Sequence, residues 1–242
     1  ETLTVMEREP LRLAEVSGIS REKAKLIGEE FHQRVGMRAL MEFFALHQLP
    51  AELAVRTYKI YGETTVELLY DDPYLLMDEG LDAPFGAVDR FAIELGVAGD
   101  DPRRVEAGIL FELRYNLTAG HAFLPEEKLV SATAQLLNIE TDTVVDGINR
   151  LLEADRLVRS FLAGITVCYL PELYEAETNC TERLLELAST RFPAPKSLEK
   201  MLRTAESESG ISYSEQQRDA IRAAATSGVL LITGGPGTGK TT

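Results

Sequence analysis

The chain has 242 residues, 45% of them hydrophobic and 26% charged, which is enough for one large globular domain or two small ones. It has no run of about 18 apolar residues and no charged-then-apolar opening, which excludes a predicted membrane span and a predicted secretory signal. Its two cysteines, Cys168 and Cys180, fit neither a disulfide framework nor a zinc site, so we expect a reducing cytoplasm.

The net charge of −14 argues against a uniformly nucleic-acid-binding surface, but the charges are unevenly distributed. Residues 1–62 are balanced, whereas residues 63–101 hold eleven acidic side chains and a single basic one, Arg90. This acidic block repels phosphate, so we interpret it as a solvated face or a protein-partner surface. DNA contacts are therefore expected at local basic clusters and at oriented backbone N–H groups.

Apolar residues recur at helical spacing through most of the chain, which predicts a mainly α-helical body. The first clear helix covers residues 20–34 and begins at Ser20, whose hydroxyl is a preferred N-cap. Two more are predicted at 37–47 and 50–61, and Gly62 ends the second of these. Further helices are predicted at 63–77, 85–95, 102–118, 125–137, 141–154 and 172–189.

The stretch from Leu157 to Leu170 has a different pattern, with apolar β-formers on both sides of Ala163-Gly164. This pattern predicts a β-hairpin. Two helices followed by a hairpin, over about residues 125–171, is the order of elements in a winged helix. Residues 190–213 contain two prolines and a polar run, and we interpret them as a linker.

The C-terminal segment changes character. A polar helix at 214–227 leads through Gly228 into Val229–Thr233, five residues that predict a buried central strand of a parallel sheet. Directly after this strand, Gly234–Thr241 matches the phosphate-binding pattern G-x-x-x-x-G-K-[ST] without a departure. A chance glycine-rich turn is the competing interpretation, and the strand context and complete spacing disfavour it.

Each part of this loop has a role in binding a nucleoside triphosphate. Glycines let the backbone curl so that successive N–H groups point at the phosphates. Lys240 supplies a cation for the β- and γ-phosphates and the Thr241 hydroxyl is the expected ligand of Mg²⁺, so these two residues are the catalytic candidates. The predicted nucleotide-binding residues of the loop are Gly234, Gly235, Pro236, Gly237, Thr238, Gly239, Lys240, Thr241 and Thr242.

A glutamine lies one short helix before the predicted strand, within Ser214–Ile221. A glutamine amide offers both a donor and an acceptor, which match the N6/N7 edge of adenine. Gln217 would therefore favour ATP over GTP. The competing interpretation is a solvated glutamine on a polar helix.

Ser-x-x-Gln-x-x-Ala-Ile at 214–221, followed by Leu-Ile-Thr-Gly-Gly-Pro-Gly-Thr-Gly-Lys-Thr-Thr at 231–242, resembles the start of a superfamily 1 helicase of the RecD-like (RecD/TraA) group. The resemblance implies that Gln217 contacts adenine, with Gln216 as a second candidate. It also implies that Lys240 and Thr241 bind phosphate and Mg²⁺. ATP and Mg²⁺ are then the cofactors, and DNA, as single strands and as single-strand/duplex junctions, is the partner.

RecD-like helicases with long N-termini carry tandem helix-hairpin-helix units, and segments beginning at Val16, Leu49 and Asp72 resemble three of them. DNA-binding hairpins normally have the pattern Gly-hydrophobic-Gly. The first unit keeps one glycine, the second has none, and the third has Asp82-Ala83-Pro84, in which proline has no N–H to donate. We expect phosphate contact only in the first unit. In the alternative interpretation, all three units serve packing alone. The predicted DNA-binding residues are Ser17, Gly18, Ile19, Ser20, Arg21, Lys23 and Lys25.

The expected fold is mainly α, in four parts. These are tandem helix-hairpin-helix units (1–101), a helical and winged-helix-like region (102–189), a linker (190–213) and the truncated start of a P-loop α/β motor domain (214–242). The resemblance implies the N-terminal part of an ATP-dependent 5′-to-3′ DNA helicase that extends beyond both ends of this chain.

We expect this fragment to be inactive by itself and to bind ATP weakly, because it lacks a second motor strand with its carboxylate, an arginine finger and a second motor lobe. Two alternatives stay open. One is a non-catalytic DNA-binding or partner-binding module, and the other is a different P-loop ATPase with a helical adaptor.

Overall fold

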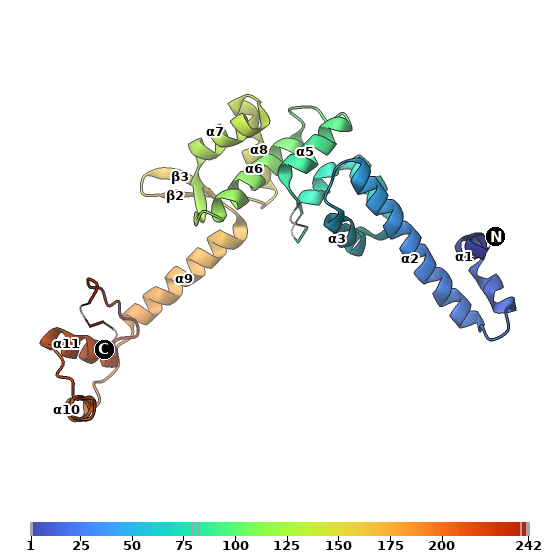
Figure 1. The fold of residues 1–242 in the computed structure, drawn as a ribbon. Coiled ribbons are helices and arrows are strands. Elements are labelled where there is room, and N and C mark those ends of the chain that lie inside the picture. The colour runs from blue at the N-terminus through green and yellow to red at the C-terminus, as the bar shows by residue number, and fades with distance from the viewer. Residues whose placement is uncertain (1, 79, 82, 238, 241–242) are drawn as a thin grey trace. The chain divides into compact units, whose positions relative to one another are not determined.

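The computed structural model describes the chain except residues 1, 79, 82, 238 and 241–242 (Figure 1). The chain divides into two compact units, 1–170 and 171–242, which are described one at a time. The described residues are mainly helical and contain one small sheet, which confirms the expected fold class. None of the described helices is both long enough and apolar enough to cross a membrane.

The first unit begins with helix α1 (Thr2–Arg8), the 3-10 helix η1 (Pro10–Glu15) and the long helix α2 (Arg21–Leu46). Ser20 caps α2 as expected, because its side chain accepts a hydrogen bond from the Lys23 N–H. The prediction of two helices at 20–34 and 37–47 was wrong, since α2 continues without a break.

The continuity of α2 has a packing reason at Gly36. A glycine costs only about 1 kcal/mol in a helix interior. At Gly36 an added Cβ would lie 2.8 Å from the Tyr58 hydroxyl, so the missing side chain lets helix α3 (Ala51–Tyr61) approach closely. Close packing of α3 therefore offsets the low helical preference of this residue.

After α3, the chain forms shorter elements than expected. Residues 63–77 were predicted as one helix and instead form η2 (Gly62–Thr64), α4 (Thr65–Asp71) and η3 (Pro73–Met77). Pro73 cannot donate a backbone hydrogen bond, which ends α4, and Asp72 caps the next turn by accepting from the Tyr74 N–H at 3.0 Å. Helices α5 (Phe85–Glu94) and α6 (Pro102–Leu117) follow as predicted.

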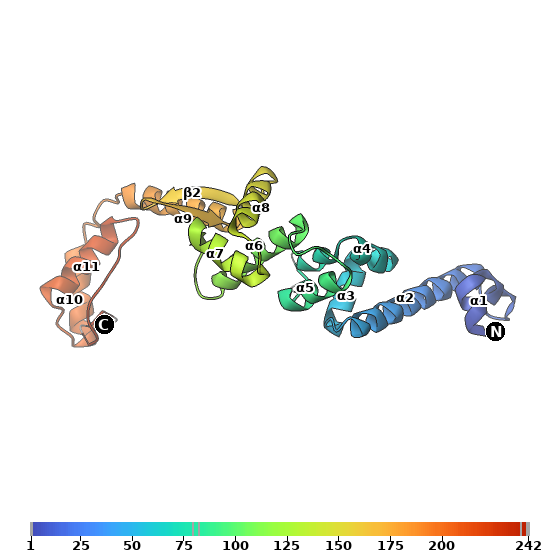
Figure 2. The ribbon, with the colours of Figure 1, turned by 90° about the horizontal axis from the view of Figure 1, so that it is seen from above.

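The rest of the first unit has a winged-helix-like arrangement. Strand β1 (Phe123–Pro125) precedes α7 (Glu126–Leu137) and α8 (Thr141–Glu153), and the hairpin of β2 (Val158–Leu162) and β3 (Ile165–Tyr169) comes last. The strands form an antiparallel sheet in the order β1-β3-β2. Figure 2 shows this part of the chain from above. The helices and the hairpin were predicted, whereas the short β1 was not. Leu129 on α7 and Val144 and Ile148 on α8 are fully buried and belong to the core of this region.

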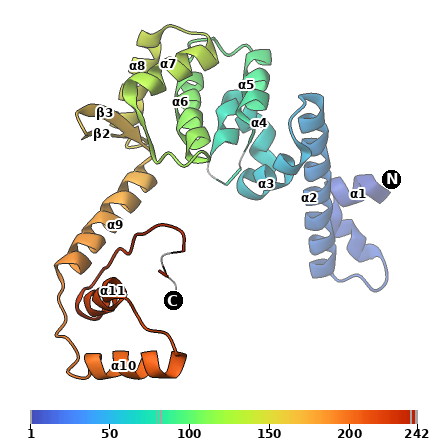
Figure 3. The same cartoon turned by 60° about the vertical axis from the view of Figure 1, so that its left-hand side comes forward.

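The second unit contains α9 (Pro171–Ser189), α10 (Leu198–Ser209) and α11 (Glu215–Thr226) (Figure 3). Helix α10 lies within the segment that we expected to be a linker. Arg222 on α11 pairs with Glu199 on α10 at 2.8 Å, and Arg218 pairs with Glu206 at 2.8 Å. These ion pairs join α10 to α11, which explains why the polar run is helical.

The strand predicted at 229–233 is not formed, so that prediction was wrong. These residues are irregular, and Leu231 is 87% exposed. A buried parallel strand needs hydrogen-bonding neighbours on both sides. Among the described residues of this unit, the one bridge recorded is the antiparallel pair Arg191 and Ser227.

Candidate functional site

The predicted nucleotide loop lies in the second unit, directly after the irregular segment. Gly237 and Gly239 have φ angles of 76° and 71°, which are costly for other residues, so glycine suits both positions. The Lys240 ammonium donates to the carbonyl oxygens of Gly234 at 2.7 Å and Gly235 at 2.6 Å. Because an ammonium has three donors, one N–H remains for another acceptor. Pro236 lies in the turn of the loop, while the predicted contributors Thr238, Thr241 and Thr242 lie outside the described residues.

Gln217 connects helix α11 to this loop. Its N–H donates to the Ser214 hydroxyl at 3.3 Å, and its side-chain oxygen accepts from the Ser214 N–H at 2.8 Å, which together form a capping box. Its side-chain nitrogen donates to the Gly239 carbonyl at 3.0 Å. The interpretation of Gln217 as a merely solvated residue is therefore wrong, because its side-chain oxygen and nitrogen each form a hydrogen bond within the protein. One amide hydrogen and one oxygen lone pair are left for a ligand.

A cavity of about 380 Å³ brings the glutamines and the loop together. This volume lies within the range of small-molecule sites. One face of α11 forms its wall, because Gln217, Ala220, Ile221 and Ala224 recur at helical spacing. Gln216, the second candidate for the adenine contact, is exposed and lines the same cavity. The other lining residues are Tyr213, Ser214, Ile232, Thr233, Gly234, Gly239 and Lys240.

Sequence reasoning missed the apolar part of this wall. Ala220, Ile221 and Ala224 were available as a periodic apolar stripe on an otherwise polar helix, and that signal could have identified them. Tyr213 had no such signal. Its place follows from the Glu206 carboxylate, which accepts from the Tyr213 N–H at 2.8 Å and from Arg218. These contacts lower the pKa of Glu206, first through the Tyr213 N–H and then through Arg218.

The predicted DNA-contacting hairpin lies in the first unit, between η1 and α2. The Ile19 N–H donates to the Val16 carbonyl at 3.1 Å, and Gly18 takes a φ of 92° to make the turn. The side chains around this turn are solvent-accessible, with Ile19 half-buried; those exposed are Ser17, Ser20, Arg21, Lys23 and Lys25. Backbone and basic side chains therefore reach solvent at the same place.

The three basic residues of this hairpin differ in their neighbours. Lys25 lies 3.6 Å from Glu29, one turn along α2. Within the part of the chain that the structure describes, Arg21 and Lys23 have no carboxylate at ion-pair distance. Because exposed, unpaired cations are available to phosphate, Arg21 and Lys23 are the stronger candidates.

The other two hairpin units are held by internal contacts. Arg56 donates to the Leu81 carbonyl at 3.0 Å, and the Leu81 side chain is fully buried. Pro84 lies at the start of α5 and offers no N–H there. Asp82, the other unusual residue of the third hairpin, lies outside the described residues. The scaffold role that we expected for both units stays a prediction.

Several carboxylates of the acidic block have partners inside the protein. Asp101 caps α6 by accepting from the Arg103 N–H at 2.9 Å, and it accepts from the Arg103 guanidinium at 3.0 Å. Both contacts lower the pKa of Asp101, the guanidinium most strongly. Asp78 accepts from the Tyr61 hydroxyl at 3.0 Å. The block is therefore only in part a solvated face, and its role as a partner surface stays a prediction.

Comparison with known proteins gives two findings. Residues 33–123 match the family model of the ATP-dependent RecD2 DNA helicase HHH domain. The ATP-dependent RecD2 DNA helicase of Deinococcus radiodurans is 27% identical over 259 aligned residues, which cover 98% of this chain. The chain spans about a third (34%) of that relative's length. Both findings support the resemblance to the N-terminal region of a RecD-like helicase, although the hairpin at 17–25 lies before the matched domain.

Proposed function

We propose that this chain is the N-terminal part of an ATP-dependent DNA helicase that moves 5′ to 3′ on single-stranded DNA. The cavity shared by Gln217 and Lys240 is the observation that carries the proposal, because it joins a candidate base contact to a candidate phosphate contact. The similarity to the RecD2 helicase over 98% of the chain supports the same function.

In this proposal the cavity binds ATP with Mg²⁺. The free amide hydrogen and lone pair of Gln217 contact the adenine edge, and Ile221 and Ala224 offer apolar surface to the ring. The Lys240 ammonium exchanges its contacts with the Gly234 and Gly235 carbonyls for the β- and γ-phosphates. Thr241 would hold the Mg²⁺, which would help to neutralise the charge that develops on the phosphates. ATP hydrolysis between two motor lobes then drives stepping along the strand.

The first unit binds DNA in this proposal. Arg21 and Lys23 contact backbone phosphates beside the turn at Gly18. The other two hairpin units, between α3 and α5, serve as scaffold. Single strands and single-strand/duplex junctions are the proposed DNA partners. The acidic block at residues 63–101 is the candidate surface for a protein partner.

ATP turnover by the intact helicase, with and without single-stranded DNA, tests this function. We expect strong stimulation by DNA and its loss on Lys240→Ala, because the ammonium is the main cation for the transferred phosphate. Lys200→Ala, an exposed lysine on α10, is the matched control. Turnover that is indifferent to DNA would favour another P-loop ATPase. DNA binding by a protein without any turnover would favour a non-catalytic module.

A further inference from the structure

The tip of the β2–β3 hairpin is an apolar projection of the first unit that the proposed function leaves unused. Phe161 is 72% exposed, and Leu162 and Ile165 are 42% and 47% exposed. Figure 1 shows the hairpin extending away from helices α7 and α8, and Figure 3 shows the same from another side. Burying apolar surface stabilises a protein by about 25 cal/mol per Å², so three exposed apolar side chains at one point call for an explanation.

The hairpin is built to hold these side chains rigidly. The strands stay paired to the last residues, with Leu162 opposite Ile165, and Ala163 and Gly164 form a tight turn with φ angles of 49° and 88°. At the other end, residues 167–170 are buried in the core. About two residues of each strand therefore project beyond the core, which is about 7 Å at the usual rise of a strand.

Each face of the tip presents at least one large apolar side chain. Phe161 pairs with Thr166 on one face of the hairpin, whereas Leu162 pairs with Ile165 on the other. A strand that packs on a single partner surface needs only one apolar face. A wedge that enters between two surfaces needs an apolar side chain on each of its faces. The flat Phe161 ring can also stack on a base.

The charge around the hairpin favours a polyanionic partner. Residues 156–170 contain Arg156 and Arg159 and no acidic side chain, although the chain carries a net charge of −14. Arg159 is engaged with Glu126 and Asn149. Arg156 is exposed at the base of the hairpin, where it lines a cavity with carboxylates from α6 and from both ends of η3, so the favourable charge is confined to the tip itself. The tip is thus a region where phosphates meet little repulsion.

Helix α8 is a poorer candidate for contact with DNA. In many winged helices the second helix enters the major groove, but the exposed side chains of α8 include Asp142, Asp146 and Glu153. These carboxylates repel the phosphates that line a groove. Contact through the hairpin tip avoids them.

From these observations we propose that the β2–β3 tip contacts the last base pair of a duplex at a single-strand/duplex junction, with the Phe161 ring stacked on it. This inference rests on the proposed DNA-binding function and assigns that function a specific contact.

The chain contains eight tyrosines and no tryptophan, so Phe161→Trp introduces a single indole at the tip, which can be excited selectively at long wavelength. We expect its emission to be quenched on adding a forked duplex, because stacking on a base quenches indole fluorescence, and less so with the single strand of the same sequence. The matched control is Tyr115→Trp, because Tyr115 is 63% exposed on α6, outside the hairpin. Its emission should not change.

Affinity provides the second readout. Phe161→Ala should weaken binding to the forked duplex about tenfold and leave binding to the single strand unchanged, and Phe161→Tyr should restore the fork affinity. If the chain binds forks but Phe161→Ala has no effect and the introduced indole is not quenched, the tip contact is wrong while the proposed function stands. If the chain binds no DNA at all, both fail.

Discussion

Arg104 and Asp89 form a two-point ion pair, with Nε 2.8 Å from Oδ1 and Nη2 3.0 Å from Oδ2. Tyr74 donates to the same Oδ1 at 2.7 Å, and Arg104 Nη1 donates to the carbonyls of Gly99 and Leu137. Burial and the contact with Asp89 raise the pKa of Tyr74. The pair therefore joins α5, α6 and the end of α7, and it uses one carboxylate of the acidic block inside the protein.

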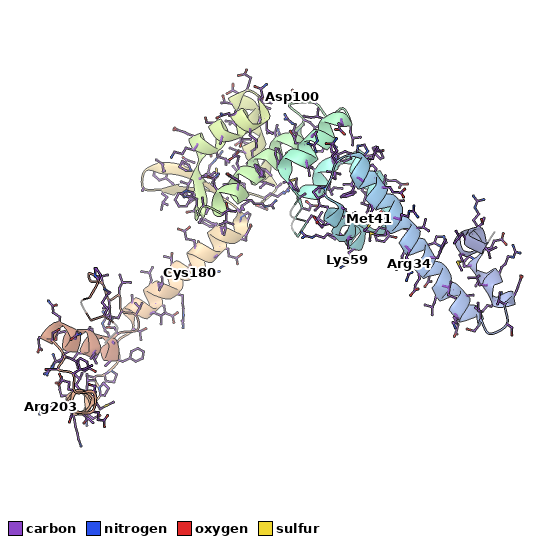
Figure 4. The ribbon with its side chains drawn as sticks, in the orientation of Figure 1. Arg34, Met41, Lys59, Asp100, Cys180 and Arg203 are labelled. Atoms are coloured by element: carbon purple, nitrogen blue, oxygen red, sulfur yellow. The ribbon has the colours of Figure 1, made fainter. Side chains whose placement is uncertain are left out.

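Loss of this ion pair should destabilise the first unit. Asp89→Ala leaves the Arg104 guanidinium, 5% exposed as a residue, without its carboxylate, and breaking a buried pair in this way costs about 3–5 kcal/mol. The free energy of unfolding from urea titration measures the loss. Asp100→Ala, at an exposed position between α5 and α6, is the control and should change it by less than about 0.5 kcal/mol (Figure 4). Equal effects would show that the pair contributes little.

The two cysteines should differ strongly in reactivity. Burial, with a smaller contribution from Glu126, raises the pKa of the Cys168 thiol to about 12, whereas Cys180 is exposed on α9 (Figure 4). Because the thiolate is the nucleophile, iodoacetamide at pH 8 should modify Cys180 in the folded chain and Cys168 only after unfolding. Mass spectrometry of the peptides distinguishes the two sites. Rapid modification of Cys168 in the folded chain would contradict its burial.

The raised pKa of the Cys168 thiol also predicts how the free energy of unfolding changes with pH. The folded pKa of Cys168 lies above the ordinary value of 9.0, so the folded state keeps its proton at pH values where the unfolded state loses it. Stability from this group is present below about pH 9 and is lost as the pH rises toward 12. Cys168→Ser should reduce this loss. Urea midpoints measured at pH 8 and pH 10 should therefore differ more in the native sequence than in the variant.

Gln217→Glu separates the capping role from nucleotide recognition. The carboxylate can still accept from the Ser214 N–H, so α11 should stay capped, but it cannot donate to the Gly239 carbonyl or to adenine. Under the proposed function we expect the ATP affinity of the intact protein to fall about tenfold or more, because a lost hydrogen bond leaves buried acceptors unpaired. Gln216→Glu adds the same charge at the second candidate for the adenine contact, which lines the same cavity. A loss confined to Gln216→Glu would move the adenine contact from Gln217 to Gln216.

Arg21→Ala and Lys23→Ala should each weaken DNA binding. Each should also reduce the slope of log affinity against log salt concentration by about one. The contacts are to phosphate, so the loss should be the same for unrelated DNA sequences. Lys59→Ala removes an exposed lysine of α3 and should leave the slope unchanged (Figure 4). Unchanged binding in both hairpin variants would favour the view that all three units serve packing only.

The sequence alone determined the features that depend on local chemistry. Ser20 and Ser214 start helices because a hydroxyl accepts from the third N–H, and Gly62 ends α3 because it accepts a positive φ. The loop at 234–241 could be found because its glycines and Lys240 have fixed spacing. These signals involve neighbours along the chain, so no tertiary contact is needed to read them.

Tertiary structure decided whatever depends on partners distant in sequence. Gly36 continues α2 because Tyr58 occupies the space of a Cβ, and Val229–Thr233 remains irregular because a parallel strand forms only beside other strands. Asp89 became an internal residue because Arg104, fifteen positions later, reaches it. Gln217 became a link to the loop because α11 folds against Gly239. A contact between residues far apart in the chain has no signature in the local sequence, because only the folded backbone brings the two residues together.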